Sequence, residues 1–446
     1  MKQIHPLSPL LREATPSLPP SRYIDGNVYA DELHNIWKKG WNYVGPLSDI
    51  APGTMRRVDV AGTNILLVRA KDGDVRAYHN VCPHRGSELC TADEQPLRGG
   101  RILCPYHAWS FNADGTLAST AAASHAPDFD KADHGLRSVG LIDWNGLLFV
   151  RPVESSVDFG ADNAFGLHDL DNWPMRELVT AGRETHLVEC NWKILWENFN
   201  ECLHCPGVHP SLCDLIPIHR KGLLAYSDAP DWTPDSMEPE HGLRDGARSW
   251  TLSGAAATAE FPGLTEDQRN AGQVYCVIWP TLFIVAHVDY ISIVSYRPKG
   301  PEQTEVTGEV LVAPAALADP NFDLHQIVAF NQQVQNEDEE VCELNQRGLR
   351  TSPFKAGVLM PEEYNVKISR LDRAANGRGG CLMTVDELIG QMAENRAWIA
   401  GARVAIDFGD DGAVLLDGIA QGVRCAELGE PADTHIAVSW TETGWR

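Results

Sequence analysis

The pattern of hydrophobic and polar positions changes along the chain. Between Met55 and Val150, short apolar runs alternate with Gly, Asp and Pro turns; these runs are Asn64–Val68, Val75–Tyr78 and Gly146–Val150. Apolar runs of this length bounded by turn residues are typical of strands. This stretch therefore predicts a small all-β domain. Before it, Ala30–Lys39 has helical character and ends at Gly40, a common helix stop.

The following part mixes both periodicities. Residues 151–183 indicate a connector, and 221–272 form a long excursion rich in Gly, Pro, Ala and Asp. Residues 190–203 predict a helix that stops before Pro206-Gly207. Two β-rich runs and one long helix follow, at Gln273–Tyr296, Glu305–Val312 and Asn321–Leu349.

The end of the chain predicts a separate small unit. Residues 371–381 have the composition of a linker, followed by a helix at 384–396 and strands near 402–407, 413–416 and 434–440. The fold class predicted for the whole chain is α+β. It consists of a small all-β domain, a larger part that combines strands and helices, and a small C-terminal α+β extension.

Composition narrows the function. The 446 residues carry a net charge of −24, which argues against nucleic acid as a partner. No run of 18 apolar residues exists, so we expect no membrane span. No secretion signal is visible in residues 1–20, which predicts a cytoplasmic location with reduced thiols. The eleven cysteines are clustered, and this favours metal ligation.

The first cluster of candidate ligands is Cys82, His84, Cys104 and His107. A C-x-H pair and a C-x2-H pair are separated by 19 residues, and both lie at Pro-containing turns. Zinc is one interpretation, but its usual spacing places two Cys in one half and two His in the other. A Rieske 2Fe–2S cluster needs one Cys and one His from each half, because one iron takes two thiolates and the other two imidazoles. The third interpretation is two buried cysteines and two surface histidines with no common role.

The second cluster has the pattern E-x2-H-x4-H, formed by Glu201, His204 and His209. Five residues apart, the two His would not share a face of one regular helix, but the Pro206-Gly207 break permits a turn. Two imidazoles and a carboxylate form the facial triad of non-haem Fe(II) oxygenases. The third ligand is expected on the long helix, where Glu337 and Asp338 lie close to an apolar stripe. That stripe is Ile327, Phe330, Val334, Val341 and Leu344.

Periodicity does not choose between Glu337 and Asp338. Two other interpretations of this segment stay open at this point. A His near a helix end is often only structural. Cys202 and Cys205, with the two histidines, could instead hold zinc.

Over residues 18–372 the chain resembles the catalytic α subunit of Rieske non-haem iron oxygenases. The motifs are the paired Cys/His loops with Trp109-Ser110-Phe111 behind them, the segment Asn191-Trp192-Lys193 to His209-Pro210, and Glu337-Asp338 with Gln346-Arg347-Gly348-Leu349. The stretch from Asn198 to Pro210 is most similar to the glycine-betaine demethylase, choline monooxygenase and carnitine oxygenase branch. Ala108 stands where many members carry Gly.

The resemblance implies that the middle part is a catalytic domain with a curved antiparallel sheet and helices (helix-grip type). It also implies roles for individual residues. Asp338 is then the third iron ligand and Glu337 its neighbour. Glu201 takes the place of the bridging carboxylate that joins a cluster histidine of one subunit, here His107, to an iron-ligating histidine of the next, here His204. The implied cofactors are a Rieske 2Fe–2S cluster and Fe(II).

The resemblance also implies partners and an activity. We expect a separate NAD(P)H-dependent flavin or iron–sulfur reductase, O2, a small-molecule substrate and a head-to-tail homotrimer. The expected reaction is monooxygenation and N-demethylation of a small methylated (quaternary) amine such as a betaine. Alternatives are an aromatic-ring-hydroxylating dioxygenase and a Rieske electron carrier without oxygenase activity.

The expected organisation has four parts. They are an N-terminal helical segment (1–45) that packs on the catalytic domain, a Rieske domain (46–155), a catalytic iron domain (156–375) and a C-terminal extension (380–446). The last part weakly resembles a sterol-carrier-protein-2-like module, which leaves a lipid-binding or scaffold role as an alternative. Trp279, His287 and Tyr290 are candidate pocket residues, with ordinary core residues as the alternative reading.

Overall fold

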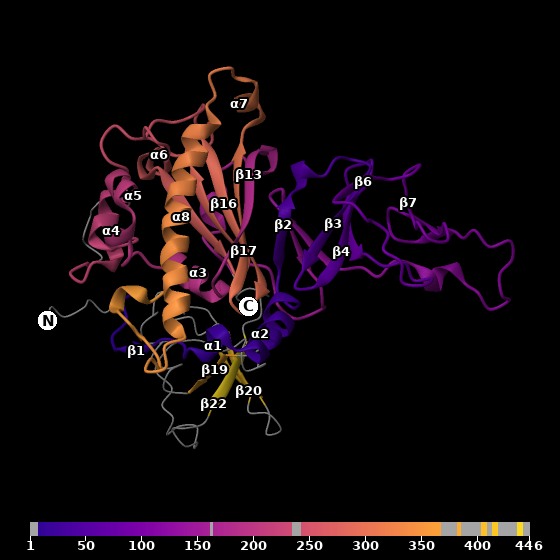
Figure 1. Cartoon of the computed structure of the whole chain (residues 1–446), viewed down its shortest axis with the longest axis horizontal. Coiled ribbons are helices and arrows are strands. Elements are labelled where there is room, and N and C mark those ends of the chain that lie inside the picture. Colours follow the sequence, from indigo (N-terminus) through magenta and orange to yellow (C-terminus); the bar gives the residue numbers. More distant parts are fainter. Residues whose placement is uncertain are drawn as a thin grey trace.

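The computed structural model describes residues 8–160, 164–233 and 242–366. It also describes four strands further on, β19 (Cys381–Thr384), β20 (Arg403–Asp407), β21 (Ala413–Asp417) and β22 (His435–Ser439). Figure 1 shows two main lobes. A β lobe, residues 42–151, extends to one side, and a catalytic lobe, residues 164–366, combines a sheet with the long helix α8 (Leu324–Leu349).

Three small antiparallel sheets build the β lobe. Their strand orders are β5-β4-β3-β6, β7-β8-β9 and β10-β11-β2. The bounds are β2 Asn42–Pro46, β3 Thr54–Val60, β4 Thr63–Arg69, β5 Val75–His79, β6 Glu94–Pro96, β7 Arg101–Leu103, β8 Ser110–Asn112, β9 Leu117–Ser119, β10 Gly140–Trp144 and β11 Leu147–Arg151. Tight turns join most neighbours, as the alternation of short apolar runs with Gly and Asp predicts.

One antiparallel sheet of order β12-β14-β15-β16-β17-β13 forms the base of the catalytic lobe. Its strands are β12 Ala164–Phe165, β13 Val179–Val188, β14 Gln273–Ile278, β15 Leu282–His287, β16 Tyr290–Gly300 and β17 Gln303–Val312. One face packs on an apolar core that includes Leu282, Ile284, Ile291, Ile293 and Leu311. The opposite face is turned toward α8, so every second residue of β16 and β17 points toward the helix.

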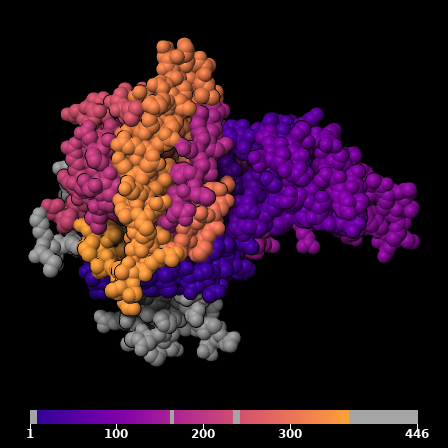
Figure 2. All heavy atoms as spheres, in the orientation of Figure 1, coloured from indigo at the N-terminus to yellow at the C-terminus, as the bar shows by residue number. Residues whose placement is uncertain are grey.

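Shorter helices surround this framework. They are α1 Ser21–Ile24, α2 Gly26–Glu32, α3 Trp192–Phe199, α4 Cys205–Val208, α5 Pro210–Leu215, α6 Glu266–Ala271 and α7 Pro314–Ala318, with a π-helix at Leu33–Trp37 that continues α2. The strands β1 (Thr15–Pro16) and β18 (Val358–Leu359) pair with each other, which ties the start of the chain to the segment after α8. The space-filling view in Figure 2 shows α8 as a continuous ridge on the surface of the catalytic lobe.

A buried ion pair fixes α2 against α3. Lys193 Nζ lies 2.7 Å from Glu32 Oε2, and both side chains are almost fully buried. Trp192 Nε1 donates to the same carboxylate at 3.0 Å, and the Tyr23 hydroxyl donates to Glu197 at 2.7 Å. Burial lowers the pKa of Lys193, and Glu32 opposes that shift. The first helices of the chain are therefore joined to the helix that leads into the Glu201–His209 segment.

Most predicted elements are confirmed. The three apolar runs lie in β4, β5 and β11, the two β-rich runs form β14 to β17, and the predicted C-terminal strands coincide with β20, β21 and β22. The long helix is α8, which begins three residues later than predicted. Asp323 caps it by accepting a hydrogen bond from the His325 N–H at 3.1 Å.

Other predictions of local structure were wrong. The predicted 190–203 helix ends at Phe199, and Pro206-Gly207 lies inside α4 because Pro fits the first turn of a helix. The connector 151–183 already contains the start of β13, and α6 lies inside the predicted excursion. Its Thr265-x-x-Gln268 capping box was a readable signal. Leu344 of the apolar stripe is exposed, because the buried positions at this end of α8 are Cys342, Gln346 and Leu349.

The C-terminal helix predicted at 384–396 and the linker at 371–381 fall almost wholly outside the described residues. The boundaries of the four expected parts stay predictions. In the part of the chain that the structure covers, no helix has the length and apolar character needed to span a membrane.

The Lys193–Glu32 pair leads to a stability prediction. Glu32→Ala leaves the Lys193 ammonium buried without its partner, and we expect a loss of about 3–5 kcal/mol of unfolding free energy. Equilibrium urea denaturation measures it. Arg347→Ala is the control, because it removes an exposed pair with Glu343 on the same lobe and should change stability by at most about 1 kcal/mol. Equal losses in the two variants would contradict the structural role of the buried pair.

Candidate functional site

Two loops of the β lobe bring the four predicted cluster ligands together. Cys82 and His84 lie between β5 and β6, and Cys104 and His107 lie between β7 and β8. Each loop is closed by backbone hydrogen bonds around its cysteine, from Gly86 N–H to Cys82 O at 2.9 Å and from Cys104 N–H to Trp109 O at 2.8 Å. Ala108 has φ +55°, a left-handed conformation that favours Gly, which gives the physical reason for Gly at this position in related sequences.

The donor groups at these loops are divided by type. Cys82 and Cys104 are both buried, and burial raises the pKa of Cys82 to about 11, with Cys104 nearby adding to the rise. The rings of His84 and His107 lie 4.7 Å apart, and His84 also stacks on Trp109 at 4.6 Å. His107 Nδ1 is buried and has no hydrogen-bond partner among the residues that the structure describes. A pair of neighbouring thiols and a pair of neighbouring imidazoles match the donor set of a Rieske cluster.

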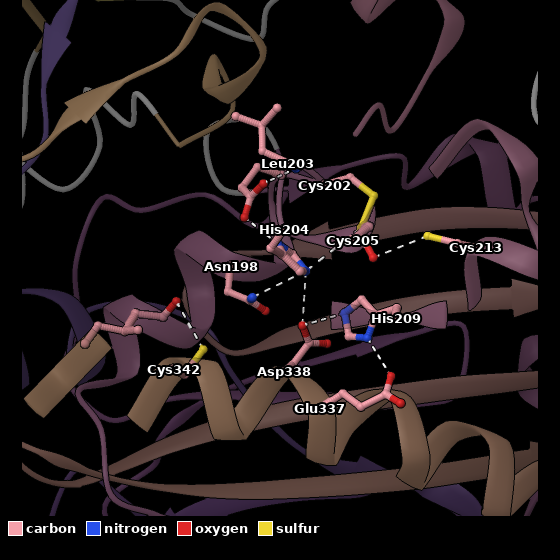
Figure 3. A network of polar contacts seen from close by, with 12 residues as sticks. Asn198, Cys202, Leu203, His204, Cys205, His209, Cys213, Glu337, Asp338 and Cys342 are labelled. Carbon is pink, nitrogen blue, oxygen red and sulfur yellow. Dashed lines mark hydrogen bonds and ion pairs between the residues drawn. A yellow bond between two sulfur atoms is a disulfide. The ribbon is translucent and has the colours of Figure 1, made fainter. Parts of the chain in front are cut away.

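The second site lies where α3, α4 and α8 meet. His204 directly precedes α4 and His209 directly follows it, so one short helix turns both rings toward α8. Figure 3 shows the two imidazoles facing Asp338. His204 Nε2 lies 3.1 Å and His209 Nε2 2.9 Å from Asp338 Oδ1. One donor atom from each residue falls within 4.8 Å of the other two, an arrangement that could hold a metal ion.

The outer nitrogen of each imidazole is held by a different carboxylate. His204 Nδ1 lies 2.5 Å from Glu201 Oε1, and His209 Nδ1 lies 2.8 Å from Glu337 Oε2. Gln333 Nε2 in turn donates to Glu337 at 3.0 Å. Such partners fix the tautomer and orientation of a metal-ligating histidine. The geometry therefore separates the two acidic candidates on α8, because Glu337 contacts the outer nitrogen of His209 while Asp338 faces both inner nitrogens.

Charge interactions hold this cluster together. Burial works against protonation of His204, but Asp338 and Glu201 outweigh it and raise the pKa of His204 to about 9. The pKa of His209 is also raised despite burial, mainly by Asp338. Burial opposes ionisation of Asp338, yet the two imidazoles hold its pKa below the usual value. A cation in place of the imidazole protons would satisfy the same carboxylate, so the residues fit a divalent metal.

The zinc interpretation of this segment is contradicted. Cys202 and Cys205 form a disulfide, which leaves neither thiol available as a ligand. The pair also departs from the expectation that the thiols are reduced. The disulfide encloses His204 in a four-residue loop, and Cys213 lies beside it with its Sγ 3.3 Å from Cys205 O. A closed loop of this size restricts the backbone on both sides of His204.

Glu201 and His107 lie in different parts of one chain. The Glu201 carboxylate is hydrogen-bonded to His204 Nδ1 and accepts a second hydrogen bond from the Leu203 N–H. Figure 1 shows β7, which leads into the His107 loop, on the side of the molecule away from α4. Within one chain, the structure therefore does not bring these two residues together.

A cavity of about 460 Å³ runs between α8 and the facing side of the sheet. At one end it reaches Asp338, Asn198, Phe199 and Tyr296, and elsewhere it is lined by Trp250. The predicted pocket residues Trp279, His287 and Tyr290 do not line it. Trp279 packs against Trp192 and Trp196, and the other two are fully buried in the core.

Sequence reasoning missed Trp250, Ser292 and Asn331, which do line the cavity. Asn331 was findable, because it lies seven residues before Asp338 and so shares its face of α8. Burial lowers the pKa of His287 to about 3, so this ring stays neutral.

Comparison with known proteins gives two family matches. Residues 40–130 match the Rieske [2Fe-2S] domain, and residues 175–368 match the ring hydroxylating alpha subunit (catalytic domain), together more than half of the chain. The glycine betaine monooxygenase oxygenase subunit of Chromohalobacter salexigens is 28% identical over 382 residues, which cover 78% of this chain and 82% of that protein.

Solved structures share the fold. The quaternary ammonium Rieske monooxygenase CntA in complex with L-carnitine superposes with a TM-score of 0.61 at 20% identity, over 85% of this chain and 100% of that one. Naphthalene 1,2-dioxygenase from Rhodococcus sp. gives 0.60 at 20% identity, over 81% and 93%. With both domain families matched in this order along one chain, the protein belongs to the Rieske non-haem iron oxygenases, oxidoreductases that use a 2Fe–2S cluster and Fe(II).

Proposed function

We propose that Cys82, His84, Cys104 and His107 hold the Rieske cluster and that His204, His209 and Asp338 hold the mononuclear iron. The observation that carries the second assignment is the convergence of two Nε2 atoms on one Asp338 oxygen, with both Nδ1 atoms held from outside. When bound, the cluster supplies stored electrons and the iron supplies open positions for the reduction of O2. The protein's own residues orient these ligands and shape the adjoining cavity.

We propose that the substrate is a small methylated, quaternary amine such as a betaine. The relatives support this, since they are named for glycine betaine, carnitine and choline. The cavity supports it as well, because its lining combines the aromatic residues Phe199, Tyr296 and Trp250 with the carboxylates Asp338 and Glu339. Aromatic faces and carboxylates attract a cation that carries no hydrogen-bond donor.

The proposed reaction is monooxygenation of an N-methyl group. One atom of O2 enters a methyl C–H bond, the other leaves as water, and two electrons come from NAD(P)H. The N-hydroxymethyl product then breaks its C–N bond and releases formaldehyde and the demethylated amine. At the reacting end of the cavity, Phe199 and Tyr296 would keep the methyl group beside Asp338 and limit access of water.

We further propose that Glu201 passes electrons between subunits of a homotrimer. Its carboxylate holds His204 and would accept a second contact from His107 of the partner subunit, since the two residues lie apart within one chain. A head-to-tail ring makes such a contact at every interface. A separate NAD(P)H-dependent flavin or iron–sulfur reductase and a cytoplasmic location complete the proposal.

The two proposed metal sites should be separable. Cys104→Ser is expected to abolish the visible absorption of the cluster and leave the mononuclear iron. His209→Ala is expected to do the reverse, because it removes one of only three protein ligands. Iron and sulfide analysis together with EPR spectroscopy measures both. Cys213→Ser is the control near the second site and should retain both metals. Loss of cluster absorption in His209→Ala would contradict the assignment.

Glu201→Gln tests the proposed electron path. The amide fills the same space but lacks the charge, so we expect both metals to be retained and cluster reoxidation to slow by about 10–100-fold. Stopped-flow absorption follows the cluster after anaerobically reduced protein is mixed with O2 and substrate. Glu363→Gln, which alters a nearby carboxylate that contacts neither histidine, is the control. An unchanged reoxidation rate in Glu201→Gln would exclude this role.

The proposed activity is tested by product analysis. Reduced enzyme incubated with O2 and glycine betaine, L-carnitine or γ-butyrobetaine should release formaldehyde in proportion to the amine consumed. An indole or naphthalene incubation should give no diol. Diol formation without formaldehyde would instead identify a ring-hydroxylating dioxygenase, to which the chain is also similar in fold. Metal-loaded enzyme that forms neither product while its cluster cycles would indicate an electron carrier.

A further inference from the structure

The cavity is lined by a side chain whose buried donor has no acceptor in the described part of the chain. Asn331 Nδ2 is shielded from solvent and makes no hydrogen bond with the described residues. Burial raises the pKa of Tyr290, and a side-chain interaction with Asn331 opposes that rise, so the amide lies near the Tyr290 hydroxyl. No hydrogen bond of normal geometry joins the two groups, and the hydroxyl donates to Trp250 O at 2.7 Å. A buried N–H without an acceptor is unfavourable unless a ligand supplies one.

Ser292 provides a second polar group on the opposite wall. In the sheet it is paired with Val285 on one side and Val310 on the other, so these three side chains form a row that faces α8. All three line the cavity together with Asn331. Ser292 is thus a hydroxyl placed between two valines, in a wall that is otherwise apolar at this level.

Asn331 and Asp338 lie on the same face of α8, two turns apart. Seven residues of α-helix separate them by roughly 10 Å. The iron-binding end of the cavity is therefore at one level of the helix and the free amide at another. A small ligand that bears a methylated nitrogen and an oxygen could contact both levels.

The charges along the cavity suit such a ligand. Arg183 also lines it, but its guanidinium is bound by Asp49 and Glu309. His186 Nε2 pairs with both oxygens of Glu339 at 2.8 Å. Among the described lining residues, Arg183 and His186 are thus already paired, and the four carboxylates Glu184, Glu309, Glu339 and Asp338 outnumber them. A ligand with net negative charge is disfavoured, whereas a cation or a zwitterion is not.

We propose that Asn331 Nδ2, assisted by Ser292 Oγ, binds an acceptor oxygen of the substrate and thereby positions its methylated nitrogen toward Asp338. This inference rests on the proposed function and sharpens it. The substrate is a methylated amine, cationic or zwitterionic, that carries a carbonyl, hydroxyl or carboxylate oxygen on the chain opposite the methyl groups. Asn331 and Ser292 are specificity-determining residues, and they take no part in the chemical step.

The test compares two ligands of similar length and charge at nitrogen. γ-Butyrobetaine carries a carboxylate at its far end, and butyltrimethylammonium carries none. Isothermal titration calorimetry measures their binding to anaerobic holoenzyme, so the readout does not depend on turnover. Asn331→Ala is expected to weaken γ-butyrobetaine binding about tenfold and butyltrimethylammonium binding less than about twofold, because only the first ligand loses a hydrogen bond.

Two further variants keep the test independent of folding defects. Asn331→Asp has the same shape but replaces the donor by a carboxylate, so it should weaken γ-butyrobetaine more than alanine does. Ser292→Ala should give a smaller loss of the same kind. Asn345→Ala is the matched control, since Asn345 is an exposed asparagine on the same helix and should alter neither ligand. In turnover, Asn331→Ala should raise KM for γ-butyrobetaine while kcat changes little.

The outcomes distinguish this inference from the proposed function. If wild-type protein binds both ligands and Asn331→Ala weakens them equally, or weakens neither, the acceptor site is refuted and the methylated-amine proposal stands. If wild-type protein binds no methylated amine, the proposed function fails and the acceptor site fails with it.

Discussion

The proposed iron site depends on one constraint, namely that each imidazole is held from behind by a carboxylate. Glu201 and Glu337 occupy the two Nδ1 atoms, which leaves both Nε2 atoms directed at Asp338. Without those outer partners, either ring could rotate and present the wrong nitrogen. The same contacts place three carboxylates and two imidazoles in a small, partly buried volume. Each imidazole lies between two carboxylates, and this alternation of charge stabilises the arrangement.

That constraint is met by the arrangement of the larger elements. α8 supplies both Asp338 and Glu337, on adjacent residues that reach different atoms of the same histidine. α3 and α4 supply the other side, and the Cys202–Cys205 disulfide closes the backbone around His204. The buried Lys193–Glu32 pair anchors α3 in turn to the start of the chain. Residues from distant parts of the sequence therefore share the task of holding a few donor atoms in place.

Much of the proposed metal sites could be predicted from the sequence, because ligands that are only a few residues apart in sequence must also lie close together in space. The Cys/His loops and the Glu201–His209 segment are local patterns, and the structure brings each set together. The long-range choice between Glu337 and Asp338 was not readable from periodicity, because adjacent helical positions differ by only 100° and both border the apolar stripe. The assignment came from resemblance, and the geometry now gives it a physical reason.

The cavity was harder to predict because it depends on how α8 lies across the sheet. Trp279 and Tyr290 are aromatic, as expected of residues in a pocket that binds a cation, yet both are buried in the hydrophobic core. Trp250 lines the cavity from a segment without regular strands, for which periodicity carries no information. Side-chain type therefore identifies a functional residue reliably only where the sequence spacing also fixes its position.

α8 carries both Asp338 and Asn331. The proposed iron ligand and the proposed substrate-binding residue are therefore kept at a fixed separation by one helix. A substrate-binding group on a loop could shift relative to the metal, whereas two positions on one α-helix keep a fixed separation. Discrimination among methylated amines would then depend on ligand length as well as on charge. Side chains on the sheet, such as Ser292, can vary the chemistry of the far end without moving Asp338, because they belong to a separate element. Relatives with this fold that act on different substrates would therefore be expected to differ at the positions of Asn331 and Ser292 before they differ around the iron.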